Sequence, residues 1–289
     1  MTITEMLSLG FIYIAGGKFE ISSADDGMHA DSSLMIEGGT IHVSESYEGL
    51  EGLSIDITGG DIDVTASDDG LNAAGGNDSS GFEGGGKDIF AVEEGAYICI
   101  SGGKVQVHAS GDGIDSNGNL TISGGETYVS GPASGGNGSI DYNGDGVITG
   151  GTFAAAGSSD MAQNFSDSST QGVMMVTVDV QTAESTVSLK DSNGNELISW
   201  TAGTEYTSVI VSCPEITRGA TYTLTAGDST QEITMDSLVY GSGGMGGRRG
   251  SGAPGQDGRM KRGAVPDQNE QMDGQEEDFS GMQKTSIVY

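Results

Sequence analysis

Carboxylates recur in this sequence as short acidic clusters, each built around a glycine that is followed by an apolar residue. The clusters read DDGMHAD at 25–31, YEGLEG at 47–52, DDGLNA at 68–73 and GDGIDS at 111–116. Aligned on the glycine, one acidic position precedes it and a second polar position follows two residues later. Clustered carboxylates bind hard divalent cations or act as general acids and bases. Both roles require secondary-structure elements that hold the carboxylates at a fixed spacing.

Pairs of adjacent glycines alternate with these acidic clusters along the chain. The pairs begin at residues 16, 38, 59, 102, 124 and 150, with spacings of 22, 21, 43, 22 and 26, and the 43 is interpreted as a double step through a Gly-rich insertion at 75–88. Apolar residues flank each pair with period two, as Ile55 and Ile57 precede Gly59 and Ile62 and Val64 follow it. This period is typical of strands, so each repeat reads as strand, glycine corner, strand, acidic corner.

One such repeat cannot bury its own apolar side chains, whereas stacked repeats place each one over its equivalent in the next coil. The sequence therefore predicts an all-β fold, a right-handed parallel β-helix of about seven coils of roughly 21–22 residues. Successive coils advance about 4.8 Å, the spacing between paired strands. The diglycines are expected to supply corners with positive φ.

Stacking brings the acidic clusters into two polar ladders along one edge of the coils. The position before the glycine is Asp26, Glu48, Asp69 and Asp112, and the second polar position is His29, Glu51, Asn72 and Asp115. Adjacent carboxylates at this spacing repel by about 1 kcal/mol in water and by more near apolar surface. Calcium ions shared between coils would offset that repulsion. A solvated acidic edge that serves solubility is the alternative interpretation.

A further acidic loop, DYNGDGVIT at 141–149, resembles the start of an EF-hand calcium loop. Its twelfth position is Thr152, where a bidentate glutamate is expected, and no helix pattern flanks it. We interpret it as a turn, with weak calcium binding as the alternative.

Composition limits the classes of partner. The 289 residues contain 11 basic and 42 acidic side chains, for a formal charge of −31, which disfavours nucleic acid and anionic membrane. No apolar run is long enough to span a membrane. The two cysteines, Cys99 and Cys213, have no metal-type spacing and are expected to be small buried or half-buried side chains. The N-terminal stretch is not read as a signal peptide.

Three domains are expected. Residues 1–160 form the parallel β-helix, residues 161–238 form a module of antiparallel strands that caps it, and residues 239–289 form a Gly-rich disordered tail. Trp200, the only tryptophan, falls in the capping module and is expected to belong to its core.

The repeats GGKFEISSADDGMHAD, GGTIHVSESYEGLEG, GGDIDVTASDDGLNAAGG and GGKVQVHASGDGIDSNGNL, with the closing GGTFAAAGSSDMAQ, resemble a family of bacterial right-handed β-helix proteins described as carbohydrate-binding and first noted in cellulolytic clostridia. The resemblance covers about residues 1–235 and identifies the chain as the C-terminal part of a member. It implies a pectate-lyase-like fold, calcium at the acidic corners, and polysaccharide binding at the cell surface. Carried onto this sequence, the calcium candidates are Asp25, Asp26, Asp31, Glu48, Glu51, Asp68, Asp69, Asn72, Asp112 and Asp115.

Three functions compete at this point. The first is a non-catalytic, calcium-dependent module that binds cellulose-like or polygalacturonate chains outside the cell, as a monomer. The second is a polysaccharide lyase, which needs a basic side chain beside the metal, although the coils carry only Lys18, Lys87 and Lys104. The third is a structural surface protein in which calcium serves only rigidity.

Overall fold

The computed structural model describes residues 2–3, 6–8, 10–74, 91–241 and 287–288. The Gly-rich insertion at 75–88 and nearly all of the expected tail lie outside these residues. Within them every regular element is a strand, which confirms the all-β, parallel-solenoid prediction. None of the described residues forms a helix long and apolar enough to cross a membrane.

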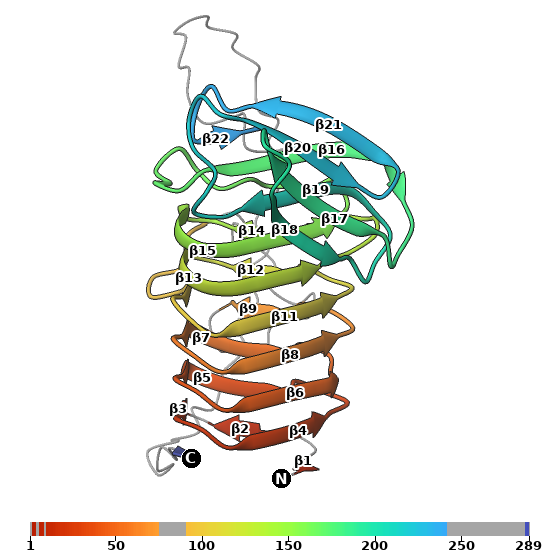
Figure 1. Ribbon diagram of the computed structural model, residues 1–289. Helices are drawn as coiled ribbons and strands as arrows, with labels where there is room; N and C mark the ends of the chain where they lie inside the picture. Colours follow the sequence, from red (N-terminus) through yellow and green to blue (C-terminus); the bar gives the residue numbers. More distant parts are fainter. Residues whose placement is uncertain (1, 4–5, 9, 75–90, 242–286, 289) are drawn as a thin grey trace, which may run out of the picture.

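Three ladders of parallel strands form the walls of the solenoid (Figure 1). Several strands bend at a corner and contribute to two ladders, so the ladders share members.

The first ladder stacks β3 (Phe11–Ile14), β5 (Met28–Ile36), β7 (Leu50–Ile57), β10 (Tyr97–Ile100), β13 (Asn119–Ser130) and β15 (Gly146–Gly157). The second ladder stacks β1 (Thr2–Ile3), β4 (Lys18–Ser22), β6 (Thr40–Glu45), β8 (Asp61–Ala66), β11 (Lys104–Ala109), β13 and β15. The third ladder stacks β2 (Met6–Ser8), β5, β7, β9 (Leu71–Ala73), β12 (Ile114–Ser116) and β14 (Asp141–Tyr142).

The solenoid has about six turns rather than the expected seven. Strand β8 pairs directly with β11, with Ile62 beside Val105, and β7 pairs directly with β10. The 43-residue step between diglycines is therefore one turn that carries an insertion, and not two turns. The sequence spacing alone resembled a double step because the extra residues of this turn, 43 − 22 = 21, add up to about one repeat.

The inward residues predicted from the period-two pattern form one continuous core. Ile36, Ile57, Ile100 and Ile122 are each 0 % exposed and stack in the first ladder. The second glycine of each diglycine has a positive φ, from +76° at Gly125 to +110° at Gly17, which confirms the predicted corners.

The chain becomes antiparallel after β15. Strands β16 (Val173–Gln181) and β19 (Tyr206–Ser212) pair with each other, and β19 also pairs with β15, so β19 covers the open edge of the last coil. A separate sheet has the order β18-β17-β20-β21. Its strands are β17 (Thr186–Asp191), β18 (Glu196–Thr201), β20 (Thr221–Ala226) and β21 (Ser229–Thr234).

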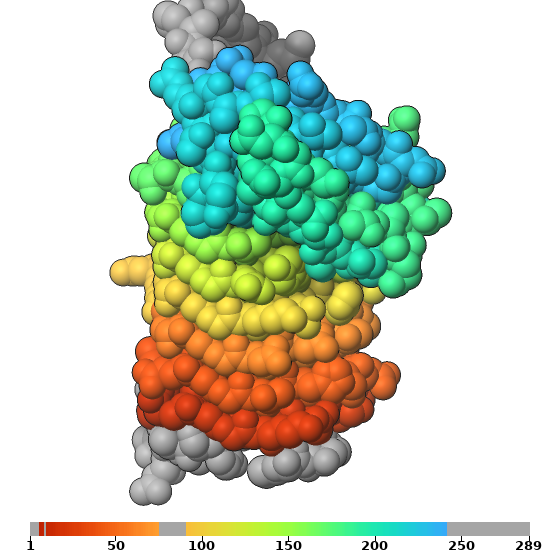
Figure 2. All heavy atoms as spheres, viewed as in Figure 1, coloured from red at the N-terminus to blue at the C-terminus, as the bar shows by residue number. Residues whose placement is uncertain are grey.

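This second sheet packs against the outer side of the last coils, and the side chains between them form a second hydrophobic core. Ala154 and Ala156 of β15 belong to that core, and the indole of Trp200 stacks on Tyr128 with ring centroids 6.0 Å apart. Short strands β22 (Val239–Tyr240) and β23 (Ile287–Val288) pair with β16 and β3. Figure 2 shows the second sheet overhanging the coils at one end.

Candidate functional site

The acidic corners line up along the third ladder as the repeat predicts. The pairing places His29 beside Glu51, Glu51 beside Asn72, Asn72 beside Asp115, and Asp115 beside Asp141. We call this row, together with Asp26, Glu48, Asp69 and Asp112 at the preceding position, the acidic edge.

Glycine is required in each acidic corner because the coils approach closely there. A Cβ on Gly49 would lie 2.2 Å from Val64 Cγ1 and 2.3 Å from the carbonyl oxygen of Gly70. The backbone of each corner therefore rests on the next coil, which fixes the spacing of the flanking carboxylates.

The carboxylates before these glycines hydrogen-bond the next coil. Asp26 Oδ1 accepts from the backbone N–H of Glu48 at 3.3 Å, Asp69 Oδ1 from that of Asp112 at 2.6 Å, and Asp112 Oδ1 from that of Gly138 at 2.5 Å. Each of these side chains thus uses one oxygen to join two coils and keeps the other for further partners.

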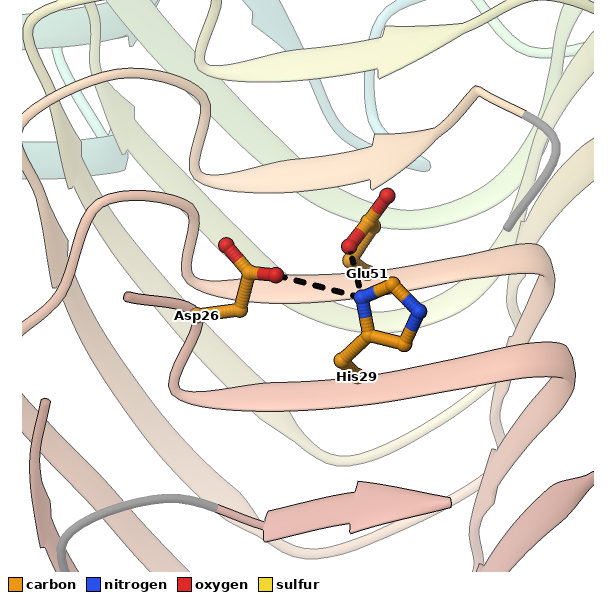
Figure 3. A group of neighbouring side chains, drawn as sticks. All are labelled: Asp26, His29 and Glu51. Carbon is orange, nitrogen blue, oxygen red and sulfur yellow. Dashed lines mark hydrogen bonds and ion pairs between the residues drawn. The ribbon is translucent and has the colours of Figure 1, made fainter. Parts of the chain in front are cut away.

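At the N-terminal end of the acidic edge, the imidazole of His29 lies between buried carboxylates (Figure 3). Nδ1 contacts Asp26 Oδ2 at 3.1 Å and also Glu51 Oε2, while Nε2 faces Asp31 Oδ1 at 3.2 Å. Because an ionised carboxylate only accepts hydrogen bonds, carboxylates at both nitrogens favour a ring that is protonated at both. Hydrogen bonds to Asp26 and Glu51 raise the pKa of His29 to about 11. We call these four residues the histidine cluster.

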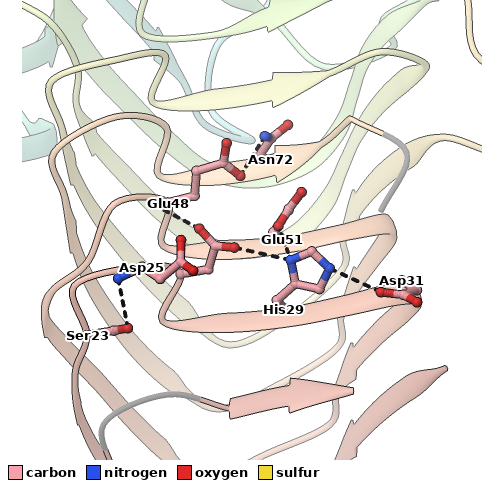
Figure 4. Close-up of polar contacts among 8 residues, drawn as sticks. Ser23, Asp25, His29, Asp31, Glu48, Glu51 and Asn72 are labelled. Carbon is pink, nitrogen blue, oxygen red and sulfur yellow. Dashed lines mark hydrogen bonds and ion pairs between the residues drawn. The ribbon is translucent and has the colours of Figure 1, made fainter. Parts of the chain in front are cut away.

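Glu48 and Asn72 form the next step of the acidic edge (Figure 4). The amide Nδ2 of Asn72 donates to Glu48 Oε2 at 2.7 Å. Burial raises the pKa of Glu48 to about 8, and the charges of Glu51, Asp26 and Asp69 add to that rise. The amide oxygen of Asn72 is buried and has no hydrogen-bond partner among the described residues. An unmet buried acceptor of this kind costs about 1–3 kcal/mol unless an ion or water satisfies it.

Three aspartates converge beyond Asn72. One carboxylate oxygen each from Asp69, Asp112 and Asp115 lie within 4.8 Å of one another. Burial raises the pKa of Asp69 to about 6 and that of Asp112 to about 7, and it raises the pKa of Asp115 well above the usual range, helped by its two neighbours. No basic side chain pairs with these three among the residues that the structure describes. We call them the aspartate cluster.

The two clusters therefore differ in how their negative charge is balanced. The histidine cluster, whose Asp26, His29 and Glu51 also offer three ligand atoms within 4.8 Å of one another, contains an imidazole with a raised pKa. The aspartate cluster has only oxygen donors, and Asn72, whose amide oxygen is unmet, pairs with Asp115 in the ladder. Carboxylate and amide oxygens are the donors that calcium takes, so these four residues fit that ion.

The structure separates the remaining calcium candidates. Asp25 is exposed, and its side chain takes part in neither cluster. Asp68 is half-buried and hydrogen-bonds the hydroxyl of Tyr47, which raises the pKa of that tyrosine to about 12. Asp31 contacts only the outer nitrogen of His29.

Sequence reasoning missed one member of the acidic edge. Asp141 pairs with Asp115 and continues the ladder, although its loop resembled an EF-hand. Asp145 of the same loop donates its backbone N–H to Asn119 Oδ1 at 2.9 Å, which ties the loop to the preceding coil. The 26-residue spacing of this repeat concealed the alignment, but the pair Ile140-Asp141, which repeats Ile114-Asp115, was a usable signal.

Residues 2–95 match the family model described as a carbohydrate-binding domain-containing protein. The matched segment runs from β1 to the end of the insertion and contains the histidine cluster, Glu48, Asp69 and Asn72. It covers less than half of the chain. Comparisons with curated proteins and with solved structures found no match. The family match favours a polysaccharide ligand.

Proposed function

We propose that this protein binds plant-cell-wall-type polysaccharide without cleaving it, and that calcium held on the acidic edge supports binding. The match of residues 2–95 to a carbohydrate-binding family model is the observation that carries the proposal. The ligand class is a cellulose-like or polygalacturonate chain. Such chains lie outside the cell, so the proposal includes a secreted or cell-surface location.

Calcium is assigned to the aspartate cluster together with Asn72. Three oxygens within 4.8 Å of one another, with raised pKa values and no basic partner among the described residues, form a set that a divalent cation stabilises. Asn72 pairs with Asp115 in the ladder, and its unmet amide oxygen is assigned as a fourth donor. Bound calcium would neutralise the carboxylates and join two successive coils.

Binding without catalysis is favoured by the state of His29, the basic group on this edge among the described residues. A lyase needs a free base beside the metal to take a proton from the sugar. Three carboxylates contact the imidazole of His29, and hydrogen bonds to Asp26 and Glu51 raise its pKa to about 11, which disfavours the neutral ring that could accept this proton.

Affinity gel electrophoresis tests the proposal. The whole chain is run through gels that contain hydroxyethyl cellulose or polygalacturonate, with calcium or with EDTA. We expect retardation in at least one gel, weakened by EDTA, and no new absorbance at 235 nm from unsaturated products. Equal mobility in all gels, together with a calcium-induced rise in Tm, would support a structural role instead.

A further inference from the structure

A groove lies on the outer side of the first ladder, on a different wall from the acidic edge. It has a volume of about 470 Å³. Its floor consists of outward-facing side chains from three neighbouring strands: Asp56 on β7, Tyr97 and Cys99 on β10, and Asn119 and Thr121 on β13. The segment 92–96 forms its rim.

Tyr97 presents an aromatic surface in this groove. Its side chain is 37 % exposed, and its hydroxyl donates to Asp56 Oδ2 at 2.7 Å across to the preceding coil. That bond fixes the ring against the sheet before any ligand arrives, which lowers the entropy cost of binding. Val92, 55 % exposed, adds apolar surface at the rim.

The rim is anchored to the next coil. The backbone N–H of Glu93 donates to the carbonyl of Asn117 at 2.8 Å, and that of Ala96 donates to the carbonyl of Glu93 at 3.2 Å. Gly95 makes the turn with a φ of +91°. The groove is thus preformed, as small-ligand sites usually are.

The charge of the groove selects among polysaccharides. Asp56, Glu93 and Glu94 contribute three carboxylates, and none of the lining residues is basic. Like charges across an interface oppose binding, so a polyuronate is disfavoured here. Hydroxyl groups instead donate to carboxylate oxygens, and the apolar C–H face of a pyranose ring fits flat on an aromatic ring.

We propose that this groove binds an uncharged, hydroxyl-rich polysaccharide, with one sugar ring on Tyr97 and its hydroxyls donating to Asp56 and Glu93. The proposal rests on the polysaccharide-binding function above and names the ligand class and the surface. Strands of the first ladder advance by about 4.8 Å, close to the length of one hexose, so a chain laid along the axis meets about one ring per coil.

The test compares Tyr97→Ala and Tyr97→Phe with a matched control, Tyr240→Ala. Tyr240 is 38 % exposed, lies on β22 beside β16, and does not line the groove. In gels with hydroxyethyl cellulose we expect Tyr97→Ala to weaken binding by about tenfold or more. Tyr97→Phe keeps the ring and should lose less, and Tyr240→Ala should bind like the wild type. Unchanged Tm values show that the variants are folded.

Cys99 gives a second readout on the wild-type protein. Its half-buried thiol lines the groove, whereas Cys213 is 1 % exposed, so alkylation followed by peptide mass spectrometry reports on each separately. Hydroxyethyl cellulose should slow alkylation of Cys99, and polygalacturonate should not.

The outcomes separate this inference from the proposed function. If Tyr97→Ala binds polysaccharide like the wild type and the ligand does not protect Cys99, the assignment of the ligand to this groove is wrong, while the proposed function stands. Protection of Cys99 by polygalacturonate would overturn the assignment to an uncharged chain. Failure of the wild type to bind any polysaccharide would overturn the proposed function and the groove together.

Discussion

At the scale of single residues, one position of the ladder changes its chemistry from coil to coil. It is the basic His29 in the first acidic corner, and then Glu51, Asn72 and Asp115. The chain thus neutralises the acidic edge internally at the N-terminal end and leaves a set of oxygen donors further along. The repeat predicted the stacking of these residues, but the charge of His29 depends on carboxylates from two coils and could not be read from the sequence.

Replacing His29 tests the internal cation. His29→Gln removes the positive charge and leaves Asp26 and Glu51 buried without it. We expect a loss of about 3 kcal/mol in the free energy of unfolding, as for one partner removed from a buried ion pair. Urea denaturation in EDTA measures it, with His42→Gln at a half-exposed site as the control. A loss no larger than that of the control would contradict the assignment.

Replacing Asp115 tests the metal site. Asp115→Asn removes a carboxylate from the aspartate cluster, so the rise in Tm that calcium produces should fall by about half or more. In EDTA the variant should be at least as stable as the wild type, because an amide replaces a carboxyl group whose ionisation burial and its two neighbours oppose. Asp25→Asn, at an exposed corner, should keep the full calcium effect. Differential scanning calorimetry measures both, and an undiminished calcium shift in Asp115→Asn would refute its role.

At the scale of elements, the inward-facing residues of the strands could be predicted from the sequence, and the contacts of the outward-facing residues could not. The alternation around each diglycine identified Ile55, Ile57 and their equivalents because a stacked core demands apolar residues there. The outward contact between Tyr97 and Asp56 depends on the direct pairing of β7 with β10. That pairing spans the insertion, so no local pattern predicted it.

The corner glycines give a prediction about packing. Gly49→Ala would drive its Cβ into Val64 and the backbone of the next coil, so we expect a loss of about 2 kcal/mol in the free energy of unfolding. Gly16→Ala, which meets nothing within 4 Å, is the control and should be close to neutral. Chemical denaturation compares the two, and equal stabilities would show that the coils are less closely stacked than described.

The acidic edge also predicts a pH dependence for the metal-free protein. Unfolded carboxyl groups titrate near pH 4, whereas Asp69, Asp112 and Glu48 titrate at about 6, 7 and 8 in the folded state. A carboxyl group whose pKa is higher in the folded than in the unfolded state contributes stability below pH 4. That contribution is lost as the pH rises through the pKa of the folded state.

We therefore expect the Tm in EDTA to fall steadily between pH 5 and pH 9. Calcium should reduce or reverse that slope, because it binds the ionised carboxylates. Thermal unfolding across this range measures both curves. A Tm in EDTA that rises with pH would contradict the buried, uncompensated carboxylates.

At the scale of the whole molecule, three features occupy different parts of the fold. The antiparallel strands close one end of the solenoid through β19, the acidic edge runs along the third ladder, and the groove opens on the first. Repetition made the solenoid and its acidic corner predictable. The overhang of the second sheet and the place of the groove depend on contacts between distant segments, such as Trp200 on Tyr128, and needed the structure.

A crystal structure of the whole chain grown with calcium, with an anomalous difference map, tests the shared-ion arrangement most directly. We predict a peak among Asp69, Asp112 and Asp115, with the Asn72 amide oxygen about 2.4 Å from the ion, and no peak at His29. A map without density at the aspartate cluster, or with the ion bound by carboxylates of a single coil, would contradict the account.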